Sequence, residues 1–198
     1  MPGSRTVSEL DGLLAAAREV LADRGYDGLR VEDVLREAGL STRAFYRHFS
    51  GKDALFLALF EQESARADLR LRARMEQAGD AVEAVREWVA AVLAVVYDPR
   101  LAKRAQVFAG ERGSLARRFP DEIDQLNRRR LESLEAVIEH GRAEGTFPAA
   151  NPANDARAIH HLCNGLIDDR LYGSTTLSRT DAVALATRFA LSALGATA

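Results

Sequence analysis

The stretch GLSTRAFYRHFSGKDAL, residues 39–55, decides the fold of the N-terminal part of the chain. Gly39 suits the left-handed backbone conformation that ends a helix, and Ser41 or Thr42 can cap the start of the next one. Apolar residues at helical spacing over 31–38 come directly before this turn. The pattern therefore predicts two short helices joined by a tight glycine turn.

The second of these helices has one apolar face. Phe45 and Phe49 lie four residues apart, so both point to the same side of the helix and are expected to be buried. The other faces carry cations, a phenol and an imidazole, from Arg43, Tyr46, Arg47 and His48. Such a helix is typical of a helix-turn-helix motif, in which the second helix lies in the major groove of DNA.

The placement of charge supports this interpretation in part. The chain has 27 Lys and Arg against 29 Asp and Glu, with a formal net charge of −2, so a nucleic acid has to be recognised by local charge. In the first 50 residues the acids lie before Gly39, whereas Arg43, Arg47 and Lys52 follow it. An ordinary helical hairpin with a solvated basic face is the alternative that the residues alone leave open.

The composition is that of a globular protein without disulfide bonds. At 198 residues the chain is long enough to bury the core of one or two domains. The single cysteine, Cys163, cannot form an intramolecular disulfide, which favours the cytoplasm. The N-terminus has no apolar run of signal-peptide length, and the longest apolar stretch, WVAAVLAVVY, is too short to cross a bilayer. We therefore expect a cytoplasmic protein with no membrane partner.

Apolar spacing predicts helices along the whole chain and no strand, so the expected fold is all-α. A capping box at Thr6 and Glu9 is expected to start the first helix, and another at Ser50 and Asp53 the fourth. The helices beyond the helix-turn-helix are expected near 52–77, 82–96, 101–108, 121–144, 152–172 and 178–194. A break is expected at GERGS, residues 110–114.

The chain from about Leu10 to Glu61 resembles the N-terminal domain of the TetR family of bacterial transcriptional regulators. The resemblance rests on RGYDG at 24–28, VEDV and AGLS between 31 and 41, and FYRHFSGKDAL at 45–55, in the order and spacing of the family. It implies a three-helix DNA-binding domain, here residues 1–52, followed by a helical domain at 53–198 that binds an effector and forms a homodimer.

The resemblance also implies roles for single residues. Thr42 and Arg43 begin the recognition helix and would face base edges, where the guanidinium fork of Arg43 can bind guanine O6 and N7. Tyr46, His48 and Lys52 match positions that usually contact phosphates. Arg47 lies at a more variable position and is expected to contact either a base edge or a phosphate.

The implied mechanism is that of a regulator, most often a repressor, that binds a near-palindromic operator in double-stranded DNA and is released by an unknown small molecule. The two half-sites are expected about one helical turn apart. The helix from Lys52 to about Gln77 is the expected lever between the effector and the DNA. Intermolecular helix pairing is expected between 121–144 and either 152–172 or the last helix, without a choice between them.

The effector site is predicted less sharply, because the second domain has no motif of its own. Pockets are mostly apolar with a few polar groups. On that ground the candidate lining residues are Trp88, Tyr97, Phe108, Phe119, Cys163 and Asn164. Each of them is also a plausible plain core residue.

Two other classes of function are alternatives to the regulator. His160 and Asp168, with Asn164, share a face of one helix and suggest a metal-dependent enzyme, but adjacent histidines at 160 and 161 point about 100° apart and no HExxH motif accompanies them. A non-specific architectural DNA-binding protein is disfavoured by the modest charge and the lack of basic tails. We therefore expect no enzyme, no catalytic residue, no metal and no cofactor.

Overall fold

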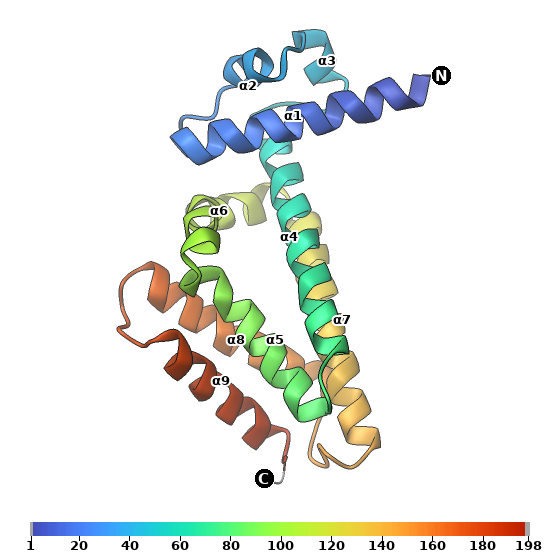
Figure 1. The fold of residues 1–198 in the computed structure, drawn as a ribbon, viewed down its shortest axis with the longest axis vertical. Helices are drawn as coiled ribbons and strands as arrows, with labels where there is room; N and C mark the ends of the chain where they lie inside the picture. The colour runs from blue at the N-terminus through green and yellow to red at the C-terminus, as the bar shows by residue number, and fades with distance from the viewer. Residues whose placement is uncertain (1, 197–198) are drawn as a thin grey trace. The chain divides into compact units, whose positions relative to one another are not determined.

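The computed structural model describes the backbone of residues 2–196, and the side chains of 2–8, 100, 103–107, 109, 110 and 112 lie outside the description. Over this range the chain forms helices and connecting loops and no strand, which confirms the all-α prediction (Figure 1). The helices are α1 (Pro2–Arg24), α2 (Val31–Ala38), α3 (Thr42–Tyr46), α4 (Lys52–Glu76), α5 (Ala81–Tyr97), α6 (Pro99–Arg118), α7 (Pro120–Ala143), α8 (Pro152–Leu171) and α9 (Arg179–Ala193).

Packing divides the chain into two compact units. Unit 1 consists of Met1–Ala65 and Gln106–Pro120, and unit 2 of Arg66–Ala105 and Asp121–Ala198. The helices α4 and α6 each contribute residues to both units. The functional division at residue 52 remains a prediction.

Unit 1 contains α1 and, as predicted, the two short helices α2 and α3 on either side of the turn at Gly39. In Figure 1, α1 crosses beside α2 and α3, and α4 starts next to the middle of α1. Its fully or nearly fully buried side chains include Leu13, Leu21, Leu29, Val34, Phe45, Leu55 and Phe56. These side chains come from all four helices, so one apolar core holds α3 in place.

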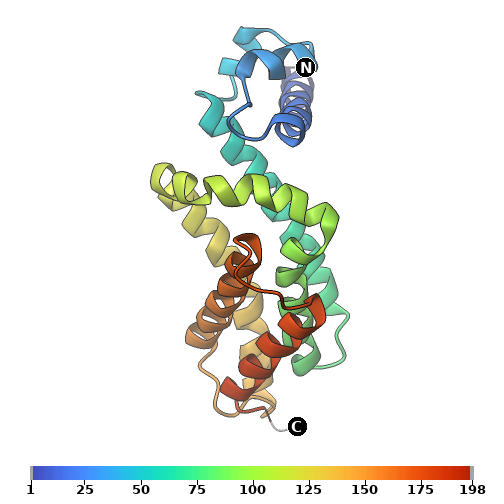
Figure 2. The ribbon, with the colours of Figure 1, turned by 90° about the vertical axis from the view of Figure 1, so that its left-hand side faces the viewer.

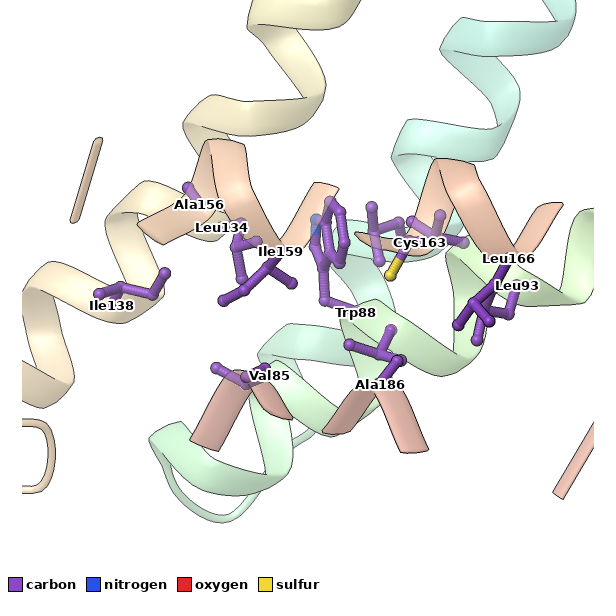
Figure 3. Packing of buried hydrophobic residues seen from close by; sticks show 14 of the residues in the cluster. Val85, Trp88, Leu93, Leu134, Ile138, Ala156, Ile159, Cys163, Leu166 and Ala186 are labelled. Carbon is purple, nitrogen blue, oxygen red and sulfur yellow. The ribbon is translucent and has the colours of Figure 1, made fainter. Parts of the chain in front are cut away.

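Unit 2 is built around α5, which packs against both α8 and α9 (Figure 2). Figure 3 shows Trp88 of α5 among side chains of α8 and α9, including Cys163 and Ala186. All three belong to one buried cluster that also takes in Leu134 and Ile138 of α7. Within the described part of the chain, no helix is long and apolar enough to cross a membrane.

Several local predictions of helix ends are confirmed. Gly39 has φ 64° and its backbone N–H bonds to carbonyls of the last turn of α2. Ser41 caps α3, while Asn151 and Ser178 accept hydrogen bonds from backbone N–H groups at the starts of α8 and α9. These caps satisfy N–H groups that the first turn of a helix leaves without partners.

Three expectations about helix ends were wrong. The first helix starts at Pro2 and runs through Thr6, whose side chain lies outside the description. Asp53 does not cap α4 with Ser50, because its carboxylate binds Tyr26 and Arg118 instead. The GERGS segment continues α6, since a glycine in a helix costs about 1 kcal/mol but ends the helix only where the backbone turns left-handed.

Gly141 of α7 provides a test of the packing in unit 2. A Cβ atom at this position would overlap the ring of Phe147, which is fully buried, and would lie 3.0 Å from the Cβ of Ala81. Gly141→Ala is therefore expected to lower the free energy of unfolding by about 1–3 kcal/mol, as overpacked cores do. Denaturant unfolding followed by circular dichroism measures this change.

Gly113→Ala is the matched control. Gly113 is exposed within α6, and among the described residues an added Cβ would meet only the Arg117 guanidinium, at 3.6 Å. Alanine favours the helix over glycine by up to about 1 kcal/mol, so this variant should be as stable as the parent chain or slightly more stable. Equal destabilisation by both substitutions would contradict the packing described for Gly141.

Candidate nucleic-acid interface

The helix α3 is held by its own buried face. Ser41 Oγ accepts the Ala44 backbone N–H at 3.3 Å and so starts the helix. Ala44 and Phe45 are buried, and Phe49, one turn later, is 7% exposed. The ring centroids of Phe45 and Phe49 lie 5.5 Å apart. The predicted inward face is therefore confirmed, and the opposite face is turned to solvent.

Three predicted DNA contacts lie on this solvent face. Thr42 and Arg43 are exposed, and Tyr46 is 61% exposed with its ring edge-on to Phe45. Arg43 forms no ion pair with any side chain that the structure describes. A free guanidinium, a hydroxyl and a phenol thus stand together on one short helix.

The next two predicted contacts face α1 instead. Arg47 forms an ion pair with Glu9 of α1. The side chain of His48 is only 10% exposed, and its Nε2 atom lies 3.8 Å from the Glu9 carboxylate. This nitrogen is buried and has no hydrogen-bond partner among the described residues. Glu9 is thus a contact of the recognition segment that the sequence interpretation missed.

The sixth predicted contact, Lys52, stands at the start of α4 above an aromatic ring. Its Nζ atom lies 4.0 Å from the centroid of the Tyr26 ring, which belongs to the loop between α1 and α2. The Tyr26 hydroxyl donates to Asp53, and Arg118 of α6 pairs with the same carboxylate. Burial, and then the hydrogen bond to Asp53, raise the pKa of Tyr26 to about 12.

The Asp53 carboxylate also raises the pKa of Arg118. No local signal in the sequence linked these residues, because Tyr26 and Arg118 lie 27 and 65 positions from Asp53. Tyr26 is part of the RGYDG element, but that element alone does not predict its partner.

The predicted effector residues do not all belong to one unit. Trp88, Tyr97, Cys163 and Asn164 lie in unit 2, and Phe108 and Phe119 in unit 1. Phe108 packs on Phe56 and Phe60, with ring centroids 5.0 Å and 5.4 Å apart. The structure thus places the half-buried Phe108 against the core of the unit that carries α3.

Of the four members in unit 2, Trp88 and Cys163 are core residues, and Tyr97 and Asn164 are half-buried. Trp88 and Cys163 are fully buried, and burial raises the pKa of the Cys163 thiol to about 12, so the thiol stays protonated at neutral pH. Asn164 lies 3.2 Å from a ring nitrogen of His160, whose ring lies edge-on to Trp88. The Tyr97 ring lies 5.2 Å from the guanidinium of Arg170.

The residues of the enzyme alternative have different surroundings. His160 is 5% exposed, whereas Asp168 is exposed to solvent. Over the residues that could be searched, no three or more His, Cys, Asp or Glu side chains are grouped as metal ligands would be.

Comparison with known proteins gives one family. Residues 13–59 match the model for bacterial regulatory proteins of the tetR family. The transcriptional regulator EthR of Mycobacterium tuberculosis is 27% identical over 156 residues, which are 77% of this chain and 70% of EthR.

Solved structures show the same fold over nearly the whole chain. A transcriptional regulator of Saccharomonospora viridis, in complex with choline, has a TM-score of 0.74 at 22% identity and covers 91% of this chain and 94% of its own. The regulator FadR of Bacillus subtilis, in complex with stearoyl-CoA, has a TM-score of 0.68 at 17% identity. The match covers 92% of this chain and 96% of the FadR chain. The family match over 13–59, which contains the helix-turn-helix at 31–46, shows that this N-terminal part of the chain is the DNA-binding domain of the TetR family of bacterial transcriptional regulators, and the solved structures show that the whole chain shares their fold.

Proposed function

We propose that this regulator is a repressor that binds a near-palindromic operator as a homodimer and is released by a small-molecule effector. In this proposal residues 1–52 bind DNA, and residues 53–198 bind the effector and form the dimer. The observation that carries it is the outer face of α3, where Thr42, Arg43 and Tyr46 are exposed while the opposite face is buried.

The side chains on and beside α3 suit different parts of a DNA duplex. A guanidinium that pairs with none of the described side chains can bind guanine O6 and N7 with both of its ends, so Arg43 is the proposed base reader with Thr42 beside it. Tyr46 and Lys52 are proposed to contact phosphates, which fixes the register of the protein on DNA. His48 has only a small exposed edge for such a contact, and Arg47 must share or give up Glu9 to reach DNA.

The effector is proposed to bind within unit 2. Three buried polar atoms there have no hydrogen-bond partner among the described residues: Trp88 Nε1, the Tyr97 hydroxyl and the Thr187 hydroxyl. A buried polar group without a partner costs about 1–3 kcal/mol, so a bound molecule that supplies acceptors gains that energy. Because the two solved relatives bind choline and stearoyl-CoA, their ligands share no chemistry that can be carried over.

A homodimer is part of the proposal because large apolar side chains are exposed on the last two helices of the single chain. Tyr172 at the end of α8 is 75% exposed, and Phe189 of α9 is 55% exposed. Covering such side chains against the same surface of a second copy is the usual solution in symmetric dimers. A dimer would also present two copies of α3, as a palindromic operator requires. We further propose that the protein works in the cytoplasm, where its operator DNA lies.

Arg43→Ala is expected to weaken binding to a DNA fragment from upstream of the chain's own gene by about 1–3 kcal/mol and to relax base preference at one position of each half-site. Fluorescence anisotropy at physiological salt measures this, with a random fragment of equal length for comparison. Arg72→Ala is the matched control, since Arg72 is also exposed and lies on α4, outside the predicted pairing helices and the predicted DNA contacts. Equal affinity of the parent chain for both fragments would favour an architectural protein instead.

Phe189→Glu is expected to move the protein from dimer to monomer, because it places a charge in an apolar interface, and to weaken operator binding at the same time. Sedimentation velocity measures the first effect. Leu69→Glu changes a side chain that is 69% exposed on α4, outside the predicted pairing helices, and should leave the dimer intact. A parent chain that sediments as a monomer at micromolar concentration contradicts the proposed dimer.

Trp88 is the single tryptophan of the chain, so its fluorescence reports on unit 2 without labelling. A molecule that binds beside it should change its emission, and Trp88→Phe should abolish the signal. Choline and stearoyl-CoA are the first molecules to titrate. A true effector should lower operator affinity about 5–150-fold, which is the usual range of coupling between two sites. Unchanged operator affinity at saturation would show that a bound molecule is not an effector.

A further inference from the structure

Four side chains of unit 1 form a connected set next to the candidate DNA interface. Tyr26 lies in the loop between α1 and α2, Lys52 and Asp53 lie in the first turn of α4, and Arg118 ends α6. Lys52 lies over the Tyr26 ring, the Tyr26 hydroxyl donates to Asp53, and Arg118 pairs with Asp53. Only Lys52 of these four was predicted to touch DNA.

The Tyr26 ring is held in a defined position. It packs on Phe56 at a centroid distance of 4.6 Å, and Phe56 is fully buried and stacks on Phe108. Burial and the hydrogen bond to Asp53 keep the phenol protonated, with a pKa of about 12, so the hydroxyl remains a donor at physiological pH. The ring therefore presents a fixed aromatic face to Lys52.

A fixed ring matters because a lysine side chain is flexible. Holding such a chain in one conformation costs rotamer entropy, which reduces the gain from a phosphate contact. An ammonium over an aromatic ring is attracted by the negative face of the ring, so part of this entropy cost is met before DNA arrives.

The neighbouring carboxylate is kept from competing for the lysine. Asp53 follows Lys52 directly in the chain, and a free carboxylate there would attract the ammonium and repel phosphates. One of its oxygens instead accepts the Tyr26 hydroxyl and the other pairs with Arg118. The positive charge of Lys52 thus remains available for an external anion.

We propose that Tyr26 is a positioning residue for Lys52, that it holds the ammonium ready for an operator phosphate, and that Asp53 and Arg118 fix the ring in turn. The inference rests on the proposed function, in which Lys52 contacts a phosphate. It assigns a part in DNA binding to Tyr26 and Arg118, neither of which belongs to the helix-turn-helix helices.

The salt dependence of operator binding tests this role, because it reports how many phosphates the protein neutralises. The slope of log K against log salt falls by about 0.9 for each phosphate that is no longer neutralised, or roughly twice that for a dimer. Lys52→Met should give this fall. Tyr26→Leu should give a similar fall and Tyr26→Phe a smaller one, since phenylalanine keeps the ring but leaves one oxygen of Asp53 without its hydroxyl donor. The double variant Tyr26→Leu/Lys52→Met should match Lys52→Met alone.

Nuclear magnetic resonance of the DNA-free protein gives a second readout that needs no leucine variant. The ε-methylene protons of Lys52, assigned by their loss in Lys52→Met, should be shifted upfield by the Tyr26 ring, and the shift should persist in Tyr26→Phe. Resonances at ordinary lysine positions would overturn the inference even if Tyr26→Leu failed to fold.

The outcomes separate the inference from the function on which it rests. If Lys52→Met lowers the slope and a folded Tyr26→Leu does not, the positioning role is overturned and the phosphate contact stands. If the slope of Tyr26→Leu/Lys52→Met falls by the sum of the two single losses, the positioning role is likewise overturned and the phosphate contact stands. An unchanged slope in Lys52→Met overturns the phosphate contact and the inference together, while the effect of Arg43→Ala still tests operator binding independently.

Discussion

The burial of one face of α3 is the constraint on which the candidate DNA interface depends. A helix of five residues has too few internal hydrogen bonds to be stable alone, so packing must hold it. Phe45 provides this packing with its ring fully buried, and Phe49 extends the same face. Because that face is buried, Arg43 and Tyr46 can only point to solvent. The apolar core of unit 1 thus orients the side chains that would read DNA.

Ion pairs explain how a slightly acidic chain can present cations in this region. Asp33 of α2 pairs with Arg24 and Arg36, and Asp53 pairs with Arg118. Exposed pairs of this kind add little to stability, usually less than about 1 kcal/mol. Their effect is on the local field, because a paired carboxylate repels phosphate less than a free one. Arg43, by contrast, has no ion pair to a described side chain, so its charge is available to an external partner.

Much of the fold could be predicted because its signals are local. The helical periodicity, the turn at Gly39 and the caps at Asn151 and Ser178 each involve residues within four positions of one another. The prediction that failed at GERGS shows the limit of such signals. Glycine at 113 weakens a helix without ending it, and whether the helix continues depends on what its other faces pack against.

The sequence by itself determined the all-α class, the helix-turn-helix and the exposed side chains of α3, because the spacing of apolar residues sets which face of a helix is buried. Only the tertiary structure decided the partners of those side chains. It placed Glu9 beside Arg47 and His48. It also assigned Phe108 to unit 1, whereas four of the candidate effector residues belong to unit 2. The reason is physical: a contact between distant segments depends on how whole helices pack, and no short-range pattern encodes that arrangement.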